Sequence, residues 1–445
     1  MTKTLQIDRV SVEDLMSLVP DRGKTPVQIG AILVLEASAG LDPAHVLATL
    51  SRRLAAVPRL RQKLVHPPPS SGRPFWVDDA QFRFADHVSI LRCPSPAGLG
   101  TVLEVAANLF MTPLPKDRPL WAATLVTDVG AGQAALILRV HHVLADGVAG
   151  LAVLAGLADG TPEPHDPQFP RPIPTRAQLT ADAAREGLRA LRDLPTALVG
   201  LARALFQFGP SLARLSPSSL NRPTGPLRRF ALLTCDLANV CDVAHSRGAT
   251  VNDVVLSSVT DALHHLMAER HESVETFVLS MPVSFRRRTT AQHLGNRSGV
   301  TPLRLPGVGE PLERLKSVAK ITSAAKLSPP GTLNALLEPG FRLLAGMGLY
   351  QRFIDHQPFV HSFVTNLKGP KIALSLDGLP IVSIIPLATA SGNVTVSFAV
   401  LSYAGQLTLT LIADQDTCPD LSRLRDLLKG ELDALTVNTR LPELL

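Results

Sequence analysis

Two adjacent histidines, His141 and His142, are followed closely by Asp146 and Gly147 in the segment HHVLADG. Apolar residues alternate with a period of two from residue 134 up to these histidines, which predicts a strand that ends there. A neutral imidazole can take a proton from an alcohol while the alcohol oxygen attacks a thioester. The segment therefore predicts acid–base chemistry, with His142 as the general base and His141 beside it.

The same residues have other interpretations. A single histidine is often a hydrogen-bonded structural residue, and two histidines with an aspartate could bind a metal ion. Adjacent strand residues point to opposite faces and no further ligand set is evident, so we predict no metal site. We expect Asp146 to hold the loop by pairing with an arginine, and Gly147 to allow a sharp turn of the backbone.

Strands and helices alternate along both halves of the chain. In the first half the apolar spacing predicts strands at 26–36, 121–129 and 134–142 and helices at 43–57, 99–110 and 148–158. In the second half it predicts strands at 229–236, 275–283, 360–366, 372–376, 380–387, 393–403 and 406–413 and helices at 237–247, 252–270 and 418–435. This alternation indicates an α/β or α+β fold with mixed sheets.

Two proline-rich stretches divide the chain. Residues 161–174 contain six prolines, and residues 210–226 are rich in proline, glycine and serine. Between them, leucines spaced by three or four residues predict a helix at 181–208, which Pro195 should kink or split. We expect an N-terminal domain at 1–160 that carries the histidines, a connector at 161–226 and a C-terminal domain at 227–445.

The composition excludes several classes of protein. Hydrophobic residues make up 45% of the chain, enough for two buried cores, while aromatic residues at 4% argue against binding nucleic acid by stacking. The net charge of +6 is spread along the chain. The first residues lack the apolar core of a signal peptide, and no window reaches the length of a membrane span. We expect a cytoplasmic protein that touches a membrane at most peripherally.

The histidine segment resembles the H-H-x-x-x-D-G signature of the coenzyme A-dependent acyltransferase superfamily. Further segments, in the same order, resemble motifs of the bacterial bifunctional wax ester synthase/acyl-CoA:diacylglycerol acyltransferase family. They are Pro119-Leu120-Trp121, Thr250-Val251-Asn252-Asp253, Met281-Pro282-Val283-Ser284-Phe285-Arg286 followed by Gly295-Asn296-Arg297, and Thr365-Asn366-Leu367-Lys368-Gly369-Pro370. The resemblance runs through nearly the whole chain.

This resemblance implies two chloramphenicol-acetyltransferase-like domains with an active-site channel between them. It implies transfer of a long-chain acyl group from acyl-CoA, the co-substrate, to diacylglycerol or a long-chain alcohol. His142 would act as base, with no covalent intermediate, no metal and no prosthetic group.

The resemblance also implies supporting residues for the site. Arg286 is the expected partner of Asp146. We expect Asn252 at a helix N-cap, where with Asp253 it could steady the wall that faces His142. Pro119, Leu120 and Trp121 of the first motif would either contact substrate or pack in the core.

The sequence departs from the family pattern at several positions. Lys368 stands where a proline is common, Thr365 where a serine is common, and residues 27–30 read V-Q-I-G in place of M-H-x-G. Because of these changes, the sequence does not determine which molecule accepts the acyl group. Acyl transfer to another hydroxyl or amine is the first alternative, and a non-enzymatic lipid-surface protein of the same fold is the second.

Two apolar stretches, 188–208 and 333–353, could line a path for the lipid or rest on a membrane. The first carries arginines near its apolar face, as interfacial helices do. Packing between the domains is the alternative that we favour for both, because apolar stripes on helices usually face a core.

Overall fold

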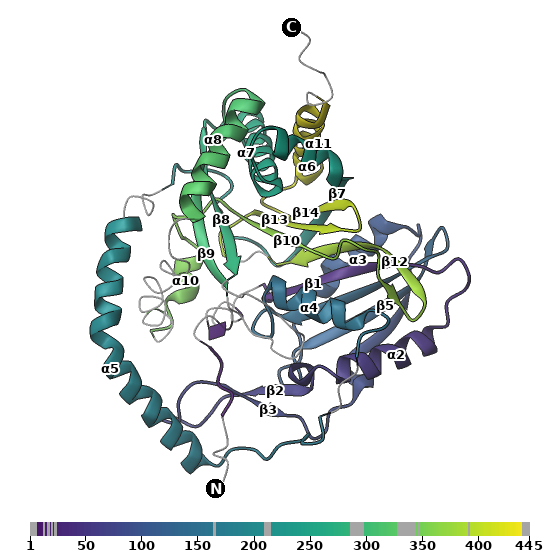
Figure 1. Cartoon of the computed structure of the whole chain (residues 1–445), viewed down its shortest axis with the longest axis vertical. Helices are drawn as coiled ribbons and strands as arrows, with labels where there is room; N and C mark the ends of the chain where they lie inside the picture. Colours follow the sequence, from purple (N-terminus) through teal and green to yellow (C-terminus); the bar gives the residue numbers. More distant parts are fainter. Residues whose placement is uncertain are drawn as a thin grey trace.

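The computed structural model describes residues 7–11, 14–15, 18, 21, 25–162, 166–208, 215–284, 298–326, 344, 347–389 and 392–437. Within these residues the strands form two six-stranded sheets and one two-stranded hairpin, and helices pack on the large sheets (Figure 1). The mixed α/β class predicted from the sequence is confirmed.

The first large sheet has the strand order β11-β12-β1-β6-β5-β4. Its strands are β1 (Gln28–Glu36), β4 (Val88–Arg92), β5 (Trp121–Gly130), β6 (Gln133–His141), β11 (Ser375–Leu376) and β12 (Leu379–Ala388). Leu136 and Leu138 of β6 face a core shared with α2 (Pro43–Ala55) and α4 (Gly147–Leu157). Ile137 faces the opposite core, beneath α3 (Leu99–Phe110). The alternation read from the sequence therefore places helices on both faces of this sheet.

The second large sheet has the order β7-β14-β13-β10-β8-β9. Its strands are β7 (Arg228–Asp236), β8 (Thr276–Ser284), β9 (Ser298–Pro306), β10 (Ser362–Lys368), β13 (Val396–Tyr403) and β14 (Gln406–Asp414). The helices that pack on it are α6 (Leu237–Ser246), α7 (Val251–Glu269), α8 (Pro311–Lys326) and α11 (Leu421–Val437). The hairpin of β2 (Gln62–Val65) and β3 (Phe75–Asp78) and the short helix α10 (Tyr350–Ile354) lie outside both sheets.

The structure differs from the predicted domain boundaries at one strand pair. β11 and β12 belong to the range 227–445, yet they complete the N-terminal sheet, where β12 pairs antiparallel with β1. β12 also lies against β13 and β14 of the other sheet. The apolar side chains of β12 pack into both cores of the first sheet, Ile384 on one face and Ile385 on the other. The two halves are therefore joined by a strand exchanged from the second into the first.

The connector forms one long helix, α5 (Arg176–Phe208), along the outside of the molecule (Figure 1). Pro195 lies inside this helix, which continues through it, so of the two expected outcomes, a kink or a split, the split does not occur. The first turn is anchored in a small core, where Leu179 packs with Phe75 and Val77 of β3. No helix in the described part of the chain is long and apolar enough to cross a membrane.

A buried ion pair fastens the C-terminal sheet to the segment that precedes β1. Arg228 and Asp414 lie 2.8 Å apart, and their side chains are 0% and 1% exposed. The same guanidinium donates to the hydroxyl of Thr25 at 2.9 Å. Because Thr25 lies just before β1, this contact ties the edge of one sheet to the entry of the other.

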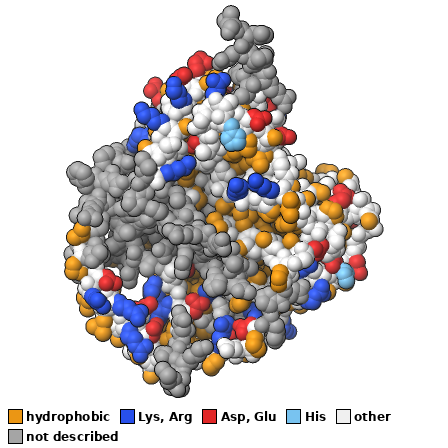
Figure 2. Space-filling view, in the orientation of Figure 1, with side chains coloured by type: hydrophobic (Ala, Val, Ile, Leu, Met, Phe, Trp, Pro, Cys, Tyr) orange, Lys and Arg blue, Asp and Glu red, His pale blue; other side chains and the backbone are white. Residues whose placement is uncertain are grey.

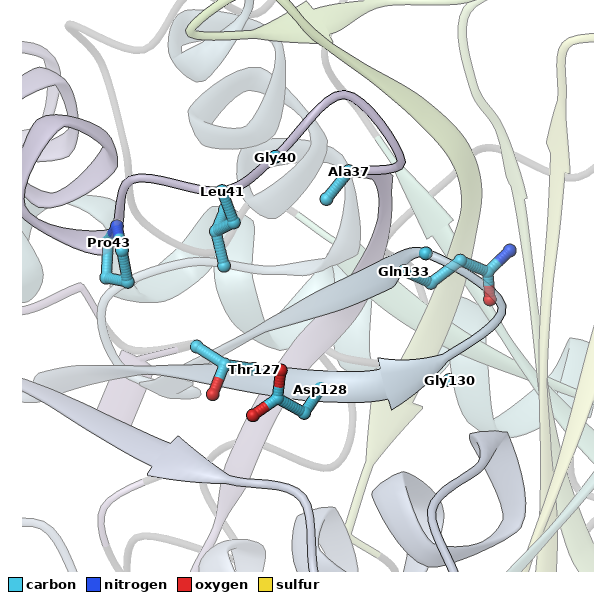
Figure 3. Close-up of a pocket in the computed structure, with 9 residues that line it drawn as sticks. Ala37, Gly40, Leu41, Pro43, Thr127, Asp128, Gly130 and Gln133 are labelled. Atoms are coloured by element: carbon cyan, nitrogen blue, oxygen red, sulfur yellow. The ribbon is translucent and has the colours of Figure 1, made fainter.

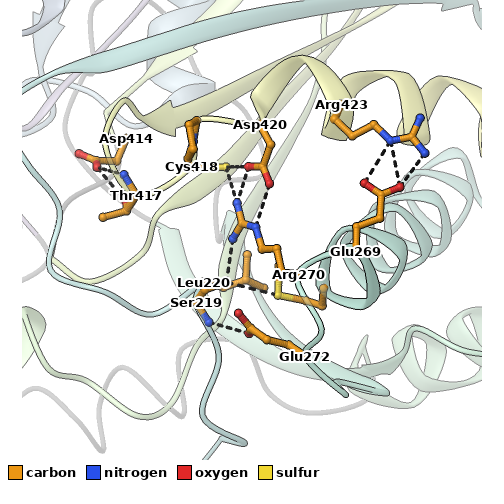
Figure 4. Close-up of polar contacts among 12 residues, drawn as sticks. Ser219, Leu220, Glu269, Arg270, Glu272, Asp414, Thr417, Cys418, Asp420 and Arg423 are labelled. Carbon is orange, nitrogen blue, oxygen red and sulfur yellow. Dashed lines mark hydrogen bonds and ion pairs between the residues drawn. The ribbon is translucent and has the colours of Figure 1, made fainter.

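A second polar network in the C-terminal domain connects the C-terminal end of α7 with the N-terminal end of α11 (Figure 4). Arg270, the residue that ends α7, donates to the Asp420 carboxylate at 2.9 Å and to the Ser219 hydroxyl at 2.7 Å. On the surface beside it, Arg423 and Glu269 form a bidentate pair. These contacts hold α11 against α7, and they lie in the domain that does not carry the histidines.

We predict that Arg228→Ala lowers the free energy of unfolding by about 3–5 kcal/mol, because it leaves the Asp414 carboxylate buried without its cation. The shift of the denaturation midpoint in urea measures the loss. Arg425→Ala, which breaks an exposed pair with Asp426, is the matched control and should leave the midpoint unchanged. Equal midpoints for both variants would contradict the role assigned to the buried pair.

Candidate active site

Backbone hydrogen bonds hold the two histidines from both sides at the end of β6. The amide of His141 donates to the carbonyl of Leu120 at 2.9 Å, and the amide of His142 donates to the carbonyl of Val27 at 3.0 Å. Leu120 lies immediately before β5 and Val27 immediately before β1. The strand that carries the histidines therefore ends between two neighbouring strands, and the next residues form a tight turn.

The ring of His141 is buried and both of its nitrogens face polar groups. Nδ1 accepts a hydrogen bond from the amide of Val143 at 3.0 Å. Nε2 lies 3.3 Å from the carboxylate of Asp21, which in turn lies 2.6 Å from the ammonium of Lys116. Burial raises the pKa of Asp21, but hydrogen bonds from His141 and Lys116 outweigh it and lower that pKa to about 2. His141 is therefore engaged by protein groups on both sides.

His142 comes directly after the strand and is half-buried. Burial lowers the pKa of its imidazole below the usual 6.5, and the nearby His141 lowers it further. A hydrogen bond with its own backbone and the carboxylates of Asp146 and Asp14 raise the pKa but do not offset the burial. The ring is therefore neutral at pH 7, which is the form that can accept a proton.

Asp146 caps the helix that follows the histidines. It is buried and is the N-cap residue of α4, where its carboxylate accepts from the amide of Ala149 at 2.9 Å. Arg286, the partner expected for Asp146, lies outside the described residues, and so do Gly295, Asn296 and Arg297 of the same motif. The structure thus gives Asp146 a capping role, and the arginine pair stays a prediction.

Gly147 serves close packing between the two halves of the chain. A Cβ on Gly147 would lie 3.0 Å from the methyl carbons of Leu367, on β10. Its backbone is not in the left-handed region, so the sharp turn expected from this glycine is not its role. The start of α4, immediately after the histidine turn, is therefore where the C-terminal sheet approaches the site.

In the motif Thr250-Val251-Asn252-Asp253, the residues have roles that differ from the predicted ones. Thr250, not Asn252, is the N-cap of α7, and Asp253 completes a capping box with it. The other carboxylate oxygen of Asp253 accepts from Thr322 of α8 at 2.7 Å, so Asp253 is structural. Asn252 lies in the first turn, where its amide oxygen accepts from Asn366 of β10 at 3.3 Å. The structure thus brings two predicted motifs together beside the domain junction.

The Pro119-Leu120-Trp121 motif packs in the core. The indole of Trp121 is buried, stacks on His87 with ring centroids 4.5 Å apart, and donates to the carbonyl of Leu60 at 2.8 Å. The side chain of Leu120 is buried as well. The motif therefore supports the site through the backbone carbonyl of Leu120 that holds His141, with its side chains in the core.

Sequence reasoning missed the N-terminal segment. Asp14 and Asp21 both lie there, and both act electrostatically on the histidines. Ser11 and Asp14 exchange hydrogen bonds in the manner of a capping box, so the pattern S-x-x-D was a usable signal for local structure. Nothing in the local sequence marks Asp21 as a partner of His141, which follows it by 120 residues.

A surface pocket of about 610 Å³ lies at the opposite end of β6 (Figure 3). It is lined by Leu41, Asp128 and Gln133, among others. Gln133 is the first residue of β6, whereas His141 is the last residue of this strand and His142 follows it. The pocket is therefore remote from the residues with acid–base chemistry. In the described part of the chain no group of three or more histidine, cysteine, aspartate or glutamate side chains could hold a metal ion.

Comparison with solved structures shows the same fold. The wax ester synthase/diacylglycerol acyltransferase from Marinobacter aquaeolei VT8 superposes with a TM-score of 0.70 at 22% identity, over 98% of this chain and 100% of that one. The first condensation domain of the calcium-dependent antibiotic synthetase, in complex with a substrate analogue, superposes with a TM-score of 0.65 at 18% identity, over 98% of this chain and 97% of that one.

Comparison of sequences shows the family. The model of the wax ester synthase/diacylglycerol acyltransferase catalytic domain matches residues 10–255, and that of the WS/DGAT C-terminal domain matches residues 294–436. The probable diacylglycerol O-acyltransferase tgs1 of Mycobacterium tuberculosis is 30% identical over 417 residues, 89% of this chain and 88% of that protein. The chain therefore belongs to the wax ester synthase/diacylglycerol acyltransferase family.

Proposed function

We propose that this chain transfers a long-chain acyl group from acyl-CoA to diacylglycerol, and to a long-chain alcohol as a second acceptor, with His142 as general base. Family membership makes an acyltransferase the natural reading of the site. The single observation that carries the mechanism is the position of His142. It is a neutral, half-buried imidazole at a strand end, beside the junction where Leu367 of the second half meets Gly147.

The chemistry needs one proton transfer in each direction. His142 takes the proton of the acceptor hydroxyl as that oxygen attacks the thioester carbonyl carbon. The carbon–sulfur bond then breaks, and the coenzyme A thiolate leaves with the proton returned by the imidazolium. No covalent acyl-enzyme forms, because both substrates bind at once and proximity supplies much of the rate gain. Neither a metal ion nor a prosthetic group takes part in this proposal.

The acceptor and the acyl donor are both amphiphilic, so the protein must meet a lipid surface. We place it on the cytoplasmic side, at the inner membrane or at lipid droplets, and assign the contact to α5. Leu179 points into the body of the protein, while Leu188 follows it by nine residues, about two and a half helical turns, and so lies on the opposite side. Leu188 and Leu191 are each 68% exposed. Leu188 and Leu191 therefore do not pack between the domains, while the side chains of residues 200–208 of the same stretch lie outside the described ones, so the packing expected for them stays a prediction.

The charges of α5 are sorted in the same way. Of its three acidic residues, Asp182 and Glu186 face the body, where they pair with Arg9 at 2.6 Å and Arg73 at 2.8 Å, while Asp193 is exposed. Its arginines at 185, 189 and 192 are exposed beside the outward leucines. Figure 2 shows basic and apolar side chains together along the lower left edge, over the N-terminal half of α5. A basic rim around exposed leucines suits an anionic lipid surface.

We predict that the purified wild type makes labelled triacylglycerol from palmitoyl-CoA and diolein, and less wax ester from palmitoyl-CoA and hexadecanol. His142→Ala should lower kcat by at least 100-fold, because the hydroxyl loses its base. His361→Ala is a matched control, since His361 is a buried histidine of the second domain. Equal rates for wild type and His142→Ala would sink the mechanism, and a wild type active only with other alcohols or amines would assign a different acceptor.

We predict an acidic limb in the dependence of kcat/KM on pH, with its midpoint below 6.5. Burial depresses the pKa of His142, so the imidazole stays neutral at pH 7 and is lost as a base only when the pH falls through its lowered pKa. The rate measured between pH 5 and pH 8 in constant ionic strength tests this. A midpoint at or above 7 would show that a group other than His142 sets the profile.

We predict that the protein floats with vesicles of phosphatidylcholine and phosphatidylglycerol, and that Leu188→Glu/Leu191→Glu weakens the binding more than tenfold. Two buried leucines contribute roughly 1.5–3 kcal/mol each to such a contact. Ile90→Glu is the control, because Ile90 is an exposed apolar residue of β4. Flotation that both variants weaken equally, or that neither weakens, would remove α5 from the proposal.

A further inference from the structure

The carboxylate of Asp21 is buried against the first histidine of the pair. Its side chain is 10% exposed, although it belongs to the segment before β1 and His141 belongs to the end of β6. A carboxylate this far from water requires compensating partners. Among the described residues it has three, the ring of His141 on the inside, the ammonium of Lys116 on the outside, and the backbone amide of Val27, which donates to Oδ1 at 3.5 Å.

The hydrogen bonds around His141 define where its proton lies. The amide of Val143 donates to Nδ1, so this nitrogen carries no proton. The proton of the neutral ring therefore sits on Nε2, which lies 3.3 Å from the carboxylate of Asp21. This separation is at the long end for a hydrogen bond, as is common before substrates bind. His141 has no nitrogen left to act as the base.

The position of His142 depends on how this first ring is held. The amide of Leu144 donates to the carbonyl of His141 at 2.9 Å, and the amide of Val143 donates to its ring, so His141 closes the turn that contains His142. A ring of His141 in another tautomer or rotamer would release the Val143 amide and let this turn move. A displacement of about 1 Å can cost on the order of 100-fold in rate.

We propose that Asp21 is a positioning residue for the reaction: its carboxylate fixes the orientation and tautomer of His141, and His141 in turn holds the turn that presents His142. Lys116 keeps the carboxylate charged from the solvent side, and Arg228 anchors the same segment through Thr25. His141 thus acts through its neighbour and not as a base. This inference rests on the proposed function, because it assumes that His142 does the chemistry.

Three variants test the proposal with palmitoyl-CoA and the acceptor that the wild type uses. Asp21→Ala should lower kcat by roughly 10- to 100-fold and leave KM for acyl-CoA within about twofold, because the proposal gives Asp21 no contact with acyl-CoA. Asp21→Asn should recover most of the rate, since its amide oxygen still accepts from Nε2 and the exposed Lys116 can turn to water. Asp21→Ser replaces Asp21→Ala if the latter does not fold.

Asp159→Asn is the matched control. Asp159 is also a carboxylate whose pKa is lowered to about 2, but it lies beyond the far end of α4 and accepts from Arg53 and Ser375. It should lower the melting temperature and leave kcat unchanged. A value of kcat for Asp21→Ala within twofold of the wild type would overturn the proposal. So would a loss of kcat that Asp159→Asn shares, or one that Asp21→Asn does not relieve.

A failure of the proposed acceptor remains distinguishable from a failure of this proposal. Thiol release from palmitoyl-CoA with water as acceptor follows the same attack on the thioester and needs no lipid alcohol. If the wild type esterifies neither diolein nor hexadecanol, the comparison of Asp21→Ala, Asp21→Asn and Asp159→Asn is made on this release. The same ordering of rates supports the positioning role, and equal rates overturn it.

Discussion

In the N-terminal sheet, β1 is hydrogen-bonded to β6 along one edge and to β12 along the other. Ile29 pairs with Val140 on the first side and with Ala388 on the second, so the end of β6 is aligned by both halves of the chain. The strands approach so closely that a Cβ on Gly30 would lie 1.9 Å from the carbonyl oxygen of Leu138. Because a shift by one residue would turn every side chain of β6 to the other face, this register decides where the histidines lie.

The second half of the chain contributes packing and hydrogen-bond restraints around the proposed base, which the first half carries. Leu367 packs on Gly147, and Asn252 and Asn366 meet beside that junction. The buried pair of Arg228 and Asp414 reaches across to the entry of β1. A site assembled this way senses the relative placement of both sheets, so its geometry is a property of the whole fold. The histidine motif alone does not determine it.

Local sequence patterns were sufficient to predict most helices and strands. They were insufficient to predict which elements lie next to one another in the fold. The alternation from residue 134 predicts β6, and the cap before α7 could have been assigned to Thr250, because Asp253 follows it by three residues. β9 was missed because it contains Pro302 and Pro306, which its place at the edge of the sheet allows. The strand at 380–387 was predicted, but no local signal says that it joins the other domain. The contact of Asp21 with His141 is hidden for the same reason, since it is set by packing between distant segments.

The exchanged strand has a consequence for how the protein is made. β12 ends at Ala388, so the first sheet lacks two of its strands until almost the entire chain has left the ribosome. During that time one edge of β1 presents unpaired backbone amides and carbonyls next to an apolar face, the kind of surface that recruits chaperones or other nascent chains. The N-terminal half is thus not a free-standing unit that folds first and waits. The last strands of the sheet must be synthesised before the histidine pair at the end of β6 acquires a defined position, so the candidate site forms only when synthesis of the chain is almost complete.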